Sequence, residues 1–124
     1  MIPLLQVALG GALGASGRYL TGVLVARLVG PGFPWATLAV NVLGSFAMGV
    51  VVVVLAQGSG QRFAPLLMTG VLGGFTTFSA FSLDAVTLYE RGQTELSLLY
   101  VAGSVILSIA ALFSGLLIAR SLTT

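Results

Sequence analysis

Charged side chains are scarce in this sequence, and cysteine and histidine are missing altogether. Only five basic and three acidic residues occur among 124, whereas about a quarter of the residues in a soluble domain are charged. Apolar residues make up 57% of the chain, and the mean hydropathy is +1.11. Such a composition cannot solvate a globular surface and is too apolar for a disordered chain. It predicts an integral membrane protein with little mass outside the bilayer.

The missing residue types also exclude whole classes of chemistry. Without cysteine there are no disulfides, thiolate metal sites or cysteine nucleophiles. Without histidine there is no imidazole catalysis, and the commonest metal ligand is lost. The few arginines are scattered along the chain, with no basic cluster of the kind that binds nucleic acid. We therefore expect neither an enzyme nor a nucleic-acid-binding protein.

Four segments are long and apolar enough to cross a bilayer, which takes about 20 residues. They cover residues 4–29, 35–56, 63–89 and 96–119, and short connections separate them. No linker is long enough for a second domain, so we expect residues 1–124 to form one all-α transmembrane domain. The 17 glycines favour close helix contacts, and four helices alone rarely enclose a water-accessible path. We therefore also expect an oligomer.

Arginines near the ends of these spans give no preferred orientation. With an even number of spans, Arg62 and Arg120 lie on one side of the membrane and Arg27 and Arg91 on the other. Because basic residues in short loops set the direction of insertion, this tie favours insertion both ways and an antiparallel homodimer. A fixed topology set by subtler features is the alternative.

Polar residues within the spans are costly in lipid and are therefore candidates for function. Arg18 lies well inside the first span, where it either extends toward the headgroups or faces a wet vestibule that attracts anions. In the second span Thr37, Asn41, Ser45 and Gly49 recur every four residues and share one helix face. The Asn41 amide serves either an interhelical hydrogen bond or an ion pathway.

The third span contains a weak place for a helix. Gly73 and Gly74 are followed closely by Thr76 and Thr77, and these residue types are poor helix formers. A break would free backbone carbonyls, which at mid-depth are tolerated only when they are buried in protein or line a wet cavity. The segment predicts either a break whose carbonyls coordinate a cation, as in discontinuous transporter helices, or a simple glycine kink.

Aromatic and hydroxyl side chains follow this segment. Phe78 and Phe81 lie one helical turn apart, as do Ser79 and Ser82. Phenylalanines in a membrane helix usually pack, although the positive edge of a phenyl ring can also accept an anion. On the fourth span hydroxyls recur at spacings of three and four, which suits either close packing or a polar track. These residues are Ser97, Tyr100, Ser104 and Ser108.

Three motifs occur in order along the chain: GGALGASGR at 10–18, TLAVNVLG at 37–44 and GGFTTFSAFS at 73–82. With the four spans and the chain length, they resemble the Fluc family, the small dual-topology fluoride channels of bacterial membranes. The third motif is highly specific, and the resemblance covers the whole chain. It implies an antiparallel homodimer in the bacterial plasma (inner) membrane, with a broken third helix and two pores that both subunits line.

The resemblance also implies roles for individual residues. Asn41 matches the pore asparagine, and Phe78 and Phe81 match two pore phenylalanines. The backbone carbonyls of Gly73 and Thr76 match those that hold a structural sodium ion (Na⁺) at the dimer interface. The other residues of the implied anion pathway are Arg18, Thr77, Ser79, Ser82, Tyr100, Ser104 and Ser108.

The implied function is passive, selective export of cytoplasmic fluoride, with fluoride, a second copy of the chain and the lipid bilayer as partners. One alternative is a small multidrug transporter, which needs a membrane-embedded carboxylate. Asp84, at a position where relatives often have Glu, lies late in the third span, and the other spans have no acid in their interiors. The other alternative is a non-transporting subunit of a membrane assembly, in which the asparagine and phenylalanines only pack.

Overall fold

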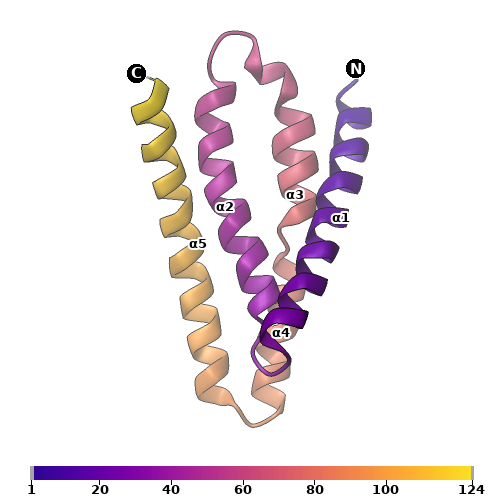
Figure 1. Ribbon diagram of the computed structural model, residues 1–124, viewed down its shortest axis with the longest axis vertical. Helices are drawn as coiled ribbons and strands as arrows, with labels where there is room; N and C mark the ends of the chain where they lie inside the picture. Colours follow the sequence, from indigo (N-terminus) through magenta and orange to yellow (C-terminus); the bar gives the residue numbers. More distant parts are fainter. Residues whose placement is uncertain (1, 124) are drawn as a thin grey trace.

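The structure, a computed structural model, describes residues 2–123, and these form helices joined by short connections (Figure 1). No β-strand occurs within that range. In chain order the elements are α1 (Pro3–Val29), α2 (Trp35–Leu55), the 3-10 turn η1 (Gly60–Phe63), the π-helical segment η2 (Pro65–Leu72), α3 (Gly73–Phe75), α4 (Phe78–Glu90) and α5 (Thr94–Thr123).

Three helical stretches are long and apolar enough to cross a membrane. They are Trp35–Leu55, Gly60–Glu90 and Thr94–Thr123, with mean hydropathies of 2.4, 1.5 and 2.3. Helix α1 is long enough at 27 residues, but Gln6 and Arg18 make it less apolar. The prediction of an all-α, multi-pass membrane protein is therefore confirmed, whereas a fourth crossing by α1 stays a prediction.

Proline and glycine set the ends of several helices. Pro3 lies in the first turn of α1, where a missing N–H costs nothing. Gly30, which follows the last residue of α1, has φ 74°, and the α4–α5 turn contains Gly92 with φ 81°. Both values favour glycine. The α1–α2 and α4–α5 connections lie at one end of the molecule, and both termini lie at the other with the α2–η1 connection (Figure 1).

The third predicted span is broken near its middle, but the break does not lie at the two glycines. Gly73 and Gly74 are helical in α3, and the residues that leave the helix are Thr76 (φ −83°, ψ 159°) and Thr77 (φ −151°, ψ 126°). Gly74 instead lies against α1, where an added Cβ would be 2.8 Å from the carbonyl oxygen of Gly11. Its lack of a side chain serves close packing rather than the break.

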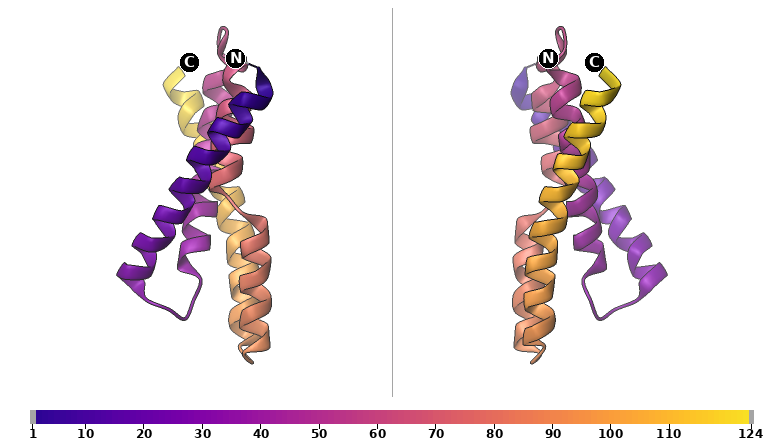
Figure 2. Two further views of the ribbon diagram at one scale, coloured as in Figure 1. Left: turned by 90° about the vertical axis from the view of Figure 1, so that its right-hand side faces the viewer. Right: turned by 90° about the vertical axis from the view of Figure 1, so that its left-hand side faces the viewer.

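Two close helix crossings hold the molecule together. Where α2 crosses α5, a Cβ on Gly115 would clash with the carbonyl of Phe46, and one on Gly49 with that of Leu112. Helix α1 crosses η2 equally closely at Gly14. Beyond these crossings α1 and α2 diverge from α4 and α5 toward the end that carries their connections (Figure 2).

The main cluster of buried apolar side chains lies toward that same end. Phe81 and Leu88 of α4 pack against Tyr100 of α5, and Phe33 of the α1–α2 connection covers the group. Large apolar side chains are exposed over much of the remaining surface, as expected for helices that face lipid.

Candidate functional site

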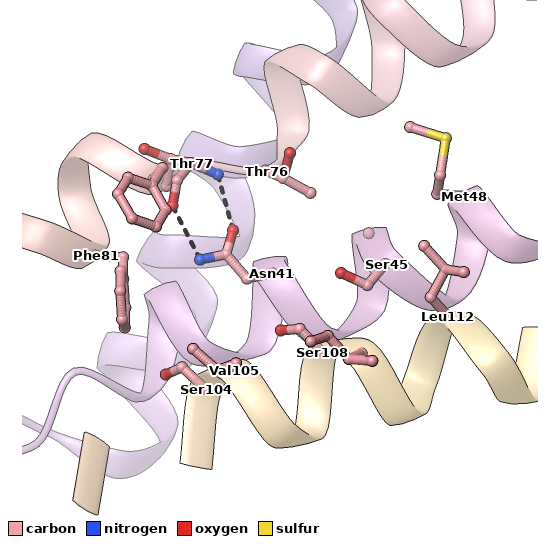
Figure 3. Close-up of a pocket in the computed structure, with 13 residues that line it drawn as sticks. Asn41, Ser45, Met48, Thr76, Thr77, Phe81, Ser104, Val105, Ser108 and Leu112 are labelled. Carbon is pink, nitrogen blue, oxygen red and sulfur yellow. Dashed lines mark hydrogen bonds between the residues drawn. The ribbon is translucent and has the colours of Figure 1, made fainter. Parts of the chain in front are cut away.

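A cleft of about 440 Å³ lies between α2, the α3–α4 break, α4 and α5 (Figure 3). Six residues of the predicted anion pathway line it: Asn41, Thr77, Phe78, Phe81, Ser104 and Ser108. The lining also includes residues that the sequence did not assign to the pathway: Gly44, Ser45, Met48, Thr76, Val105, Ile109 and Leu112. Ser45 had a usable signal, because it follows Asn41 by one turn on the same helix face.

Asn41 bridges α2 to the break through both ends of its amide. Its Nδ2 donates to the carbonyl oxygen of Thr77 at 2.9 Å, and its Oδ1 accepts from the Thr77 N–H at 2.8 Å (Figure 3). The sequence left two roles open for Asn41, an interhelical hydrogen bond and an ion pathway. These two hydrogen bonds fulfil the first role. Because an amide carries two N–H donors, one donor remains beyond this pair for the cleft that Asn41 lines.

The start of α4 presents hydroxyls and phenyl rings. Thr77 caps the helix by accepting the Ala80 N–H at 3.1 Å, as threonine commonly does at this position. The rings of Phe78 and Phe81 lie 5.4 Å apart, but Phe78 is 77% exposed and Phe81 only 8%. Phe81 therefore forms a fixed part of the wall, while Phe78 projects outward.

Two predicted serines of α4 lie outside the cleft lining. The Ser79 hydroxyl lies 3.3 Å from that of Thr77, and Ser82 donates back to the carbonyl of Phe78 at 2.9 Å. Local backbone hydrogen bonds of this kind are common for serine in helices. Ser82 is therefore placed apart from the polar groups of the cleft, whereas Ser79 lies next to the cleft through Thr77 without lining it.

Ser104 on α5 has an unusual environment. Its hydroxyl is buried and has no hydrogen-bond partner within residues 2–123, although the side chain lines the cleft together with Ser108. A buried hydroxyl without a partner costs free energy. The oxygen itself is enclosed, so a ligand with acceptor character in the cleft would satisfy it once the hydroxyl turned toward the cleft.

Arg18 lies near the break, on the side of α1. Its Nε donates to the carbonyl oxygen of Gly74 at 3.0 Å. It lines a second cleft of about 380 Å³, together with Thr37 and Thr77. Arg18 therefore lies outside the lining of the main cleft, whereas Thr77 lines both clefts.

Tyr100 and Asp84 form a polar group behind Phe81. Tyr100 is 1% exposed, and its hydroxyl donates to Oδ2 of Asp84 at 3.2 Å. Thr37 of α2 donates to the same oxygen at 2.7 Å. Sequence reasoning placed Tyr100 on the polar track and missed this three-residue group, since three separate helices supply it.

The break also leaves two backbone carbonyls without their usual helical donors. In a continuous helix the N–H of Thr77 would bond to Gly73, and that of Ala80 to Thr76. Here Thr77 donates to Asn41, and Ala80 donates to the Thr77 side chain. Neither the Gly73 nor the Thr76 carbonyl therefore receives its usual helical hydrogen bond.

The comparison with family models and the comparison with individual proteins agree with each other. The family model described as "CrcB-like protein, Camphor Resistance (CrcB)" matches residues 5–116. A protein of Cereibacter sphaeroides named fluoride-specific ion channel FluC is 68% identical over 117 residues, which cover 94% of each chain. Proteins with the same name from Paracoccus denitrificans and Agrobacterium fabrum are 57% and 53% identical, over 95% and 98% of this chain and 94% and 99% of their own.

Proposed function

Since the chain belongs to the CrcB-like family, we propose that it is a fluoride-selective channel through which cytoplasmic fluoride leaves a bacterial cell across the inner membrane. The observation that carries this proposal is the 68% identity, over 94% of both chains, to a protein named fluoride-specific ion channel. The cleft supports this proposal, because its lining combines hydroxyl and amide donors with phenyl rings and contains no carboxylate.

The cleft can bind a small anion without a formal countercharge. The unpartnered Ser104 hydroxyl, the Ser108 hydroxyl and the remaining Asn41 N–H are donors, and the edge of the Phe81 ring is positive. Passive flow suffices for export, because moving one charge across 100 mV changes its free energy by about 2.3 kcal/mol. A negative cell interior therefore drives fluoride outward.

The direct test is ion efflux from liposomes that contain the purified protein. Fluoride should leave rapidly once a potassium ionophore clamps the membrane potential, and chloride should leave far more slowly. Efflux of neither anion, or proton-coupled movement of organic cations, would contradict the proposal and support the alternatives.

The pore would be completed by a second copy of the chain in antiparallel orientation. Three features support this: the arginine tie, the outward-facing Phe78, and a cleft that opens on the surface of one chain. A single cysteine placed in the 57–61 connection of this cysteine-free protein tests the topology in intact cells. About half of the copies should react with an impermeant thiol reagent, whereas all-or-none labelling would contradict dual topology.

The carbonyls at the break that lack their usual helical donors would hold a structural sodium ion. Gly73 and Thr76 offer two uncharged oxygens per chain, which suits a hard cation that prefers oxygen ligands. A bound ion stabilises the folded protein by mass action. Replacing sodium with a large organic cation should lower the thermal unfolding midpoint, with potassium as a second comparison. An unchanged midpoint would contradict the site, whatever the effect on flux.

A further inference from the structure

Aromatic rings form a row from the cleft to the α1–α2 connection. The Phe81 ring in the cleft wall lies 5.2 Å from that of Tyr100, centroid to centroid. Tyr100 meets Phe33 at 5.4 Å with the rings at 89°, an edge contact. Phe33 in turn lies 4.6 Å from Trp35, the first residue of α2. A residue outside every helix is therefore linked to the cleft through two rings.

The middle of this row is held from several sides. Tyr100 is 1% exposed and bonds to Asp84, which also accepts from Thr37. Phe81 packs on one part of the Tyr100 ring, and Phe33 packs on another. Since Phe81 is almost fully buried, the angle at which its ring faces the cleft depends on where Tyr100 lies behind it.

The backbone fixes Phe33 in place although it belongs to a connection. The Trp35 N–H donates to the Phe33 carbonyl at 2.8 Å. Gly30 and Gly32 have φ values of 74° and 120°, which favour glycine and define the turn. The turn thus holds the backbone on both sides of Phe33, whose ring packs against Tyr100 and the buried cluster at this end.

We propose that Phe33 is a positioning residue for the anion path. By covering Tyr100, it fixes the tilt of the Phe81 ring in the wall of the cleft. Aromatic contacts depend on ring orientation, so leucine at position 33 would fill part of the space without holding this angle. The inference rests on the proposed channel function, because its readout is anion flux.

The test compares fluoride efflux per assembled protein in liposomes, with assembly checked by size-exclusion chromatography. Phe33→Leu should lower the rate about three- to tenfold, which corresponds to losing one oriented aromatic contact. Phe33→Tyr keeps the ring and should conduct nearly as the parent does. Phe63→Leu is the matched control, since Phe63 lies in η1 at the opposite end of the molecule, against Arg62.

A double-mutant cycle separates positioning from a general structural effect. If Phe33 acts through Phe81, adding Phe33→Leu to Phe81→Ile should lower flux no further. An equal loss in both backgrounds would overturn the inference, as would parent-like flux from Phe33→Leu. Should Phe33→Leu assemble poorly, Phe33→Met is measured in the same way. A parent protein that conducts no fluoride would instead refute the proposed function.

Discussion

At the scale of single residues, Asn41 is the side chain that joins α2 to the break. Its amide bonds to both the N–H and the carbonyl of Thr77. In Asn41→Asp an oxygen replaces Nδ2 and faces the Thr77 carbonyl, so a donor is lost and two acceptors meet. We expect a loss of stability of about 1–3 kcal/mol and fluoride flux more than about tenfold lower per assembled protein. Denaturant titration and liposome efflux measure the two effects, and parent-like values in both would contradict this role.

Two buried serines on α5 provide a matched pair. Ser97 donates to the carbonyl of Ala85 at 2.7 Å, whereas the Ser104 hydroxyl has no partner in the described part of the chain. Ser97→Ala should therefore cost about 1–3 kcal/mol of stability and leave flux unchanged. Ser104→Ala should leave stability unchanged or slightly raised but reduce flux. A loss of stability with unchanged flux for Ser104→Ala would mean that Ser104 only packs.

At the scale of elements, the α2–α5 crossing depends on glycine. A Cβ on Gly115 would meet the backbone of α2, while one on Gly103, on the same helix, would have no atom within 4 Å. We expect Gly115→Ala to destabilise the protein by about 1–3 kcal/mol and Gly103→Ala to be neutral or stabilising by up to about 1 kcal/mol. Thermal unfolding in detergent checks the difference. Equal midpoints for the two variants would show that the crossing is not close.

The helices and a break within residues 73–77 follow from the sequence, but which of these residues leave the helix does not. Apolar length predicts α2, η1 to α4, and α5, and glycine and proline mark their ends. Gly73 and Gly74 are poor helix formers, yet they stay helical. Thr77 leaves the helix because its N–H and carbonyl bond to Asn41 and its hydroxyl caps α4. That partner is 36 residues away, and no local pattern specifies it.

At the scale of the whole molecule, the cleft is assembled from three distant parts of the chain. The spacing left packing and a polar path open for Asn41, Phe81 and Ser104, and the family resemblance assigned all three to one anion pathway. The structure brings them to one cleft. Spacing could not show that Tyr100 lies behind Phe81, because this depends on how α4 packs against α5. The same is true of Asp84, whose hydroxyl partners come from α2 and α5.

The central claim is that this cleft conducts fluoride, and Phe81→Ile tests it most directly. Isoleucine is apolar and fills part of the same volume, so the cost in packing should be small, but it has no positive ring edge. Phe113→Ile, an exposed position on α5 outside the cleft lining, is the control. Fluoride efflux per assembled protein should fall strongly for Phe81→Ile and stay at the parent rate for Phe113→Ile. Parent-like efflux from well-assembled Phe81→Ile protein would contradict the account.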